Sequence, residues 1–90
     1  MITAAQLRAA RALLGIDQKK LAELSGVSLP TIQRMEASEG NVRAIVDTLS
    51  KVVDALQHEG VELIGEHVRS DAGGRGVRLR QAGPQNARPN

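Results

Sequence analysis

Apolar residues follow a helical spacing over residues 42–60 of this chain. The pattern i, i+3, i+4, i+7 is met by Val42, Ile45, Val46, Leu49, Val52, Val53 and Leu56. Such spacing places these side chains on one face of an amphipathic helix, and Gly60 is a residue type that ends helices. We therefore predict a helix that begins at Val42, ends at Gly60 and buries this face.

A shorter helix is expected near the N-terminus, from Thr3 to Leu14. Thr3 is a suitable N-cap, Gln6 completes a capping box three residues later, and Gly15 is positioned to stop the helix. Helical periodicity then gives the segment one apolar face, made of Leu7, Ala10 and Leu14.

Two more short helices are expected between these segments. The first, Gln18 to Ser25, has Asp17 as a suitable N-cap and ends at Gly26. The second begins near Ser28, which is again a good N-cap residue. Pro30 would lie in its first turn, where a missing backbone N–H costs little, and its interior residues would be Ile32 and Met35.

Beyond Gly60 the hydrophobic period changes to two. Apolar and polar residues alternate over 61–63 and over 77–80, which predicts two short strands around a glycine-rich segment. Antiparallel pairing would place Glu62 opposite Arg78 or Arg80. We expect the apolar strand residues to form or support a dimer interface made of Val61, Leu63, Val77 and Leu79.

These elements predict a mainly α fold in one small unit. Four helices would occupy residues 1–60, the strand pair residues 61–80, and a disordered tail residues 81–90. Because the chain has no aromatic residue, aliphatic side chains and methionine must fill the core.

Composition excludes several function classes. The absence of cysteine rules out disulfides and thiolate chemistry and suits a reducing cytoplasm. The N-terminal residues lack the features of a signal peptide, and no apolar run approaches the roughly 20 residues that span a bilayer, so we expect no membrane association. The net charge of +2 is too small to indicate nucleic acid by itself, so the positions of the basic residues must decide.

Catalysis is not expected either. His58 and His67 are the only histidines, and neither has metal-ligand spacing or a partner arrangement for nucleophilic catalysis. The glycines at 73, 74 and 76 do not follow a strand and open a helix, as a phosphate-binding loop would require. We therefore predict no enzyme activity, no metal and no cofactor.

The strongest functional signal lies in residues 17–36. Gly26 permits a left-handed turn, Ala22 is small enough to let the next helix approach, and apolar side chains fill the angle between the two helices. This segment, DQKKLAELSGVSLPTIQRME, resembles the helix-turn-helix of the Cro and phage-repressor type, also called the xenobiotic-response-element family. The resemblance covers roughly residues 3–57. It implies a lambda-repressor-like four-helix domain whose second motif helix enters the major groove of double-stranded DNA, usually as a homodimer.

Helix geometry indicates which residues would contact DNA. If Ile32 and Met35 point into the core, Gln33 and Arg34 point away from it, where they could bond adenine and guanine edges. The resemblance further implies a phosphate contact for Gln18. The complete predicted DNA-binding set is Gln18, Lys19, Ser28, Leu29, Pro30, Thr31, Gln33, Arg34, Asn41 and Arg43.

Two further pairs of residues bear on the resemblance. Leu29 and Pro30 stand where many relatives carry polar base readers, so contacts with thymine methyl groups would replace hydrogen bonds there. The resemblance also pairs Arg11 with Glu36, and such a pair would clamp helices together without touching DNA.

The sequence thus predicts a transcriptional repressor of a bacterium, phage or mobile element that binds an inverted-repeat operator as a dimer. Two alternatives remain open. An antitoxin-type protein would bind a protein partner through its C-terminal region and autoregulate its operon. A degenerate helix-turn-helix would serve protein contacts alone.

Overall fold

The computed structural model describes residues 2–65 and 73–80 of the 90-residue chain. Four α-helices precede a two-stranded antiparallel sheet, which confirms the predicted fold class. The elements are α1 (Ala4–Leu14), α2 (Gln18–Ser25), α3 (Leu29–Glu36), α4 (Val46–His58), β1 (Val61–Ile64) and β2 (Gly76–Leu79). The tail over 81–90 that was predicted to be disordered lies outside the described residues, as does His67. Over the described residues, no helix combines the length and the hydropathy that a bilayer crossing requires.

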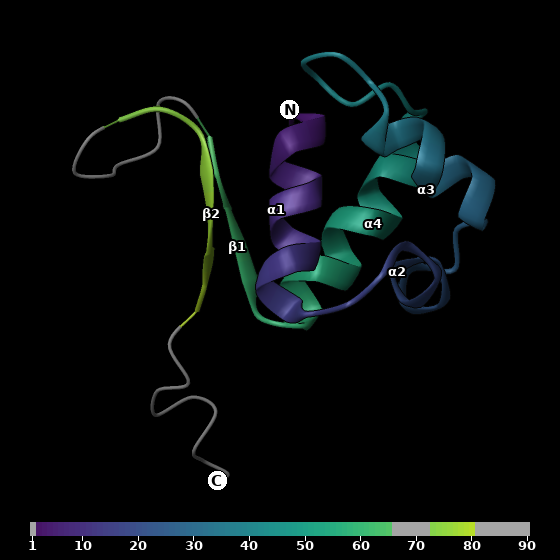
Figure 1. The fold of residues 1–90 in the computed structure, drawn as a ribbon, viewed down its shortest axis with the longest axis horizontal. Helices are drawn as coiled ribbons and strands as arrows, with labels where there is room; N and C mark the ends of the chain where they lie inside the picture. Colours follow the sequence, from purple (N-terminus) through teal and green to yellow (C-terminus); the bar gives the residue numbers. More distant parts are fainter. Residues whose placement is uncertain (1, 66–72, 81–90) are drawn as a thin grey trace, which may run out of the picture.

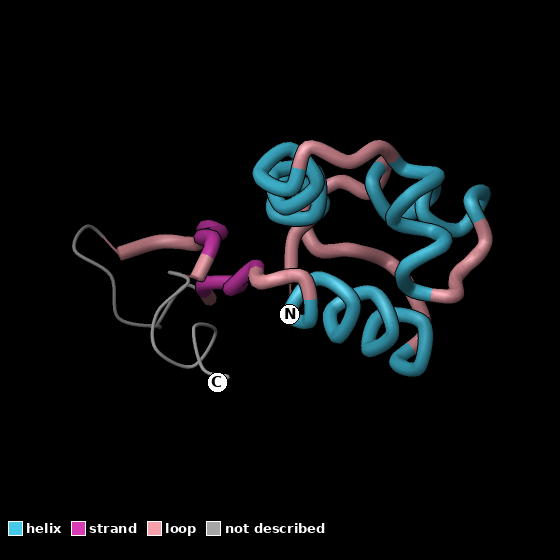
Figure 2. The backbone as a smooth tube through the Cα atoms, turned by 90° about the horizontal axis from the view of Figure 1, so that it is seen from below, coloured by secondary structure: helices cyan, strands magenta, loops and turns pink. Residues whose placement is uncertain are grey.

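The elements are arranged in three layers. Figure 1 shows the strand pair on one side, α1 and α4 in the middle, and α2 and α3 on the other side. The contacts agree, since both strands pack against α1, β1 also packs against α4, and α2 packs against α3 and α4. Seen from below in Figure 2, the strand pair stands beside the helical body. The strand pair is therefore remote from α3.

A single hydrophobic cluster connects the layers. Leu7, Leu21, Ile32, Leu56 and Val61 are all fully buried, and each comes from a different element. Aliphatic side chains and Met35 fill this cluster, as expected for a chain without aromatic residues.

Residues at the start of α1 tie that helix to the strand pair. Thr3 and Gln6 form the predicted capping box, in which the Gln6 side-chain oxygen accepts the Thr3 amide at 2.9 Å. The Gln6 side-chain nitrogen donates to the backbone carbonyls of Ile64 and Gly76, both at 2.9 Å. Because Gln6 is buried, these bonds satisfy a polar group that would otherwise destabilise the fold.

The predicted start of the long helix is wrong. The helix α4 begins at Val46, not at Val42, because the backbone before it is engaged elsewhere. The Val42 amide donates to the Ile2 carbonyl at 2.9 Å, and Thr3 forms a β-bridge with Asn41. Val42 is still buried, but from an extended segment.

Two residues of the predicted apolar face are consequently on the surface. Ile45 is 72% exposed and Val46 is 78% exposed, whereas Val52 and Leu56 are fully buried as predicted. The periodic pattern therefore describes the buried face of α4 correctly only from Leu49 onward, where side chains pack on the core.

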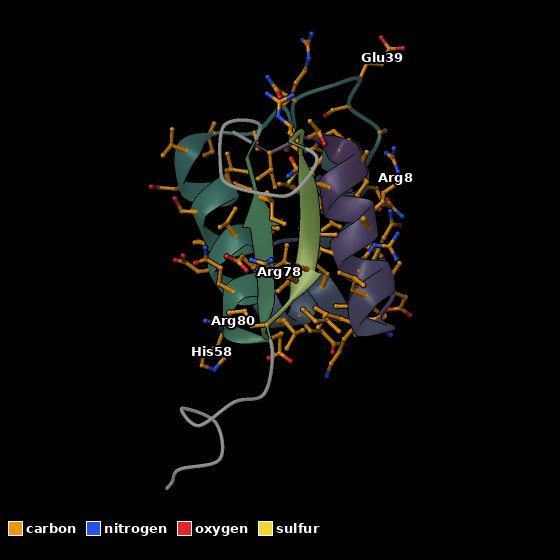
Figure 3. All side chains as sticks on the ribbon, turned by 90° about the vertical axis from the view of Figure 1, so that its left-hand side faces the viewer. Arg8, Glu39, His58, Arg78 and Arg80 are labelled. Atoms are coloured by element: carbon orange, nitrogen blue, oxygen red, sulfur yellow. The ribbon has the colours of Figure 1, made fainter. Side chains whose placement is uncertain are left out.

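The strand pair has the expected antiparallel register. Val61 pairs with Leu79, Glu62 with Arg78, and Leu63 with Val77. The Arg78 guanidinium donates to the Glu62 carboxylate at 2.6 Å, so the first of the two expected partners of Glu62 is the correct one. Figure 3 shows Arg78 on the outward side of the strand pair.

Candidate nucleic-acid interface

The turn between α2 and α3 sets the position of α3. Gly26 adopts a left-handed conformation with φ of 71°, and its amide donates to the Ala22 carbonyl at 2.9 Å. The Val27 amide donates to the same carbonyl, and its side chain is buried between the helices. This compact turn is the one that the sequence predicted.

The helix α3 has one buried and one exposed side. Ile32 and Met35 are buried in the core, while Gln33 and Arg34 are exposed, as predicted. Pro30 is exposed as well, and Leu29 is half-buried. The exposed side of α3 therefore presents an amide and a guanidinium to solvent, which are the two side-chain types that form bidentate bonds with purine edges.

Side chains spaced three residues apart along α3 bond to one another. Ser28 caps the helix by accepting the Thr31 amide at 3.4 Å. Its hydroxyl donates to Thr31 Oγ1 at 2.9 Å, and Arg34 Nη2 donates to the same oxygen at 3.1 Å. The guanidinium of Arg34 is thereby drawn back along the helix toward Thr31.

The end of α3 is fixed by an ion pair with α1. Arg11 Nε donates to Glu36 Oε2 at 2.6 Å, and Arg11 Nη2 donates to Glu36 Oε1 at 2.8 Å. The side-chain hydrogen bond with Glu36 raises the pKa of Arg11 above its ordinary value, although partial burial opposes this shift. Arg8 of α1 also donates to the Glu36 carbonyl. The clamp that the resemblance implied is therefore present.

Gln18 joins this ion pair. Its side-chain nitrogen donates to Glu36 Oε1 at 3.1 Å, so Gln18 at the start of α2 is connected to the last residue of α3. A primary amide has a second N–H, which can still donate to a phosphate oxygen. The ion pair thus orients the residue that was predicted to contact phosphate.

A surface depression of about 320 Å³ separates α3 from the start of α4. Its lining combines two guanidinium groups and two hydroxyl groups with small or apolar residues, namely Thr31, Arg34, Arg43, Ala44, Ile45 and Thr48. The N-cap of α4, Ile45, makes no side-chain capping bond. Positive charge and hydroxyl donors at a helix N-terminus favour a phosphate oxygen.

Sequence reasoning missed three members of this depression. Ala44 and Thr48 carried no signal of their own, and Ile45 was assigned to the core because it matched the helical period. The missing capping residue before α4 is the feature that could have indicated a surface site.

The other predicted DNA contacts are less tightly grouped. Lys19 is exposed on α2, and Asn41 is exposed in the segment that pairs with Thr3, so neither lines the depression beside Arg34. Ser28, Leu29 and Pro30 all belong to the first turn of α3 or precede it directly.

The apolar strand residues predicted for a dimer lie on the side of the strand pair that faces the helices. Val61 is fully buried, so it belongs to the core of a single chain. Leu63 and Val77 are half-buried against the core, and Leu79 is 45% exposed. Leu79 is therefore the member of this set that is most available to a second copy.

The comparisons with known proteins agree with this geometry. A family model described as helix-turn-helix matches residues 7–59, which is more than half of the chain. No curated protein sequence matches the chain significantly. The match runs from within α1 to the end of α4 and includes the turn, the exposed side of α3 and the Arg11–Glu36 pair. The chain therefore belongs to the Cro/C1-type helix-turn-helix family of DNA-binding transcription regulators.

Proposed function

We propose that the protein is a cytoplasmic transcriptional repressor that reads a short operator with α3 in the major groove. The observation that carries this proposal is the exposed pair Gln33 and Arg34 on α3, with Arg43 lining the depression beside Arg34 and Gln18 bonded to Glu36 at the end of the helix. Base readers on the helix and phosphate contacts beside it are the two components that sequence-specific binding requires.

The proposed phosphate contacts come from the starts of α2 and α4. Gln18 and Lys19 lie in the first turn of α2, where the helix dipole favours an anion. Arg43 and Thr48 border the depression at the start of α4. Contacts from the starts of both helices would hold α3 along the groove and fix its position relative to the bases.

We further propose that a homodimer binds an inverted repeat. Two copies related by a two-fold axis would place their α3 helices in successive major grooves, roughly 34 Å apart. Leu79, the exposed apolar residue of the strand pair, is our proposed dimer contact. Sedimentation of the protein alone and with a duplex selected from random sequence measures the stoichiometry, and one monomer bound per duplex would contradict the proposal.

The location of the strand pair supports a second role. Because β1 and β2 lie on the side of the molecule opposite α3, a protein partner could bind them while α3 occupies DNA. An antitoxin-type function would use this side for its partner. Co-expression with the product of a neighbouring small reading frame, followed by co-purification, tests this alternative.

Arg34→Ala tests the readout. We expect it to weaken binding to the selected operator by about 1–3 kcal/mol and to remove the preference at one base pair per half-site. Lys51→Ala is a matched control, because Lys51 is an exposed cation on α4 that lines a different depression, next to Leu24. Fluorescence anisotropy at constant salt measures both variants. Equal binding by Arg34→Ala and the wild type would show that Arg34 reads no base.

A further inference from the structure

Thr31 occupies the centre of the side-chain bonds along α3. Its hydroxyl oxygen accepts one bond from the Ser28 hydroxyl at 2.9 Å and one from Arg34 Nη2 at 3.1 Å. A hydroxyl has two acceptor lone pairs and one hydrogen. Both acceptor sites of the Thr31 hydroxyl are therefore used by these two side chains.

These bonds limit the positions that the Arg34 guanidinium can take. Arginine has a long side chain with many rotamers, and ordering it on DNA normally opposes binding. Here one nitrogen is already held by Thr31, three residues earlier on the same side of α3. The remaining N–H groups of the guanidinium are therefore partly ordered before DNA arrives.

The result is a guanidinium with a defined chemical preference. Two N–H groups of Arg34 match the two acceptors that guanine presents in the major groove, O6 and N7. Adenine presents one acceptor, N7, beside an amino group, thymine presents one acceptor, O4, beside a methyl group, and cytosine presents an amino group, so each would leave at least one of the two donors without an acceptor.

We propose that Thr31 is a positioning residue that aims Arg34 and thereby restricts the base pair it reads to guanine. This inference rests on the proposed DNA-binding function and assigns a cause to its specificity. Thr31 acts through Arg34, so its effect is confined to the base pair that Arg34 contacts.

A purely structural role for Thr31 can be separated from the proposed role of positioning Arg34. The cap of α3 is made by the Ser28 oxygen and the backbone amide of residue 31, and both are retained in Thr31→Val. Valine has the shape of threonine without the hydroxyl, and Thr31 is only half-buried. Thr31→Val therefore removes the bond to Arg34 and leaves the cap in place.

The experiment compares the full-length wild type with Thr31→Val, Thr31→Ser and Arg34→Ala. Selection from randomised duplexes first gives the operator of the wild type, and the position where Arg34→Ala loses its preference identifies the base pair of Arg34. Competition binding then measures affinity for operators carrying each of the four base pairs there. Urea unfolding of all variants confirms that they fold.

For Thr31→Val we expect about tenfold weaker binding to the guanine operator and little change in affinity for the other three operators. The preference for guanine over the other bases would then be nearly lost. Thr31→Ser retains the hydroxyl and should retain the preference. The proposal would be overturned if Thr31→Val preferred the guanine operator as strongly as the wild type does. It would also be overturned if Thr31→Val lost affinity equally for all four operators, because that result indicates a phosphate contact. If the wild type selects no operator, the proposed function fails together with this inference.

Discussion

Arg11→Ala is expected to lower the free energy of unfolding by about 3 kcal/mol, because it leaves the Glu36 carboxylate buried without its cation. The Glu36 side chain is only 4% exposed and that of Arg11 is 22% exposed, so little water can replace the lost bonds. Urea denaturation with a two-state fit measures the effect.

The ion pair between Arg78 and Glu62 provides a matched control. Its shortest N–O distance, 2.6 Å, equals that of Arg11 and Glu36, but its side chains are 60% and 41% exposed. Arg78→Ala should therefore cost less than about 1 kcal/mol. Similar losses in the two variants would mean that burial does not decide the strength of these pairs, contrary to our interpretation.

The same ion pair connects stability to DNA binding. Glu36 accepts bonds from Arg11 and Gln18, so it joins α1, α2 and the end of α3. Loss of Arg11 would remove the two shortest bonds that fix the Glu36 carboxylate, to which the Gln18 amide is also bonded. The Glu36 carboxylate, which need not touch DNA, thus fixes the proposed base-reading helix and the proposed phosphate-binding residue relative to each other.

Local signals predicted most of the helix boundaries. Thr3, Asp17 and Ser28 cap their helices as expected, and Gly15 and Gly26 end them. These features depend on residues within one turn, where side-chain and backbone preferences act directly. The start of α4 depended instead on a distant partner, the backbone near Ile2, and periodicity alone could not reveal it.

In the candidate site, too, local features were predictable and contacts between distant segments were not. The exposure of Gln33 and Arg34 followed from the period of α3 once Ile32 was assigned to the core. The bond from Gln18 to Glu36 and the depression beside Arg34 depend on packing between helices, which no local pattern specifies. Likewise, alternation predicted which strand residues share a side but not that this side covers α1 and α4.

Ile32→Ala and Ile45→Ala together test the assignment of the core around α3 and α4. Both isoleucines match a helical apolar pattern in the sequence, yet Ile32 is fully buried and Ile45 is 72% exposed. We expect Ile32→Ala to destabilise the protein by about 2–5 kcal/mol, since it removes buried methyl groups and leaves a cavity beneath α3.

Ile45→Ala should change the free energy of unfolding by less than about 0.5 kcal/mol, because its side chain already contacts water. The substitution is chemically identical in the two variants, so the difference in urea midpoint reports burial alone. A large loss at Ile45 would place the start of α4 in the core, as the periodic pattern first indicated. A small loss would agree with an exposed Ile45 at the border of the depression beside Arg34.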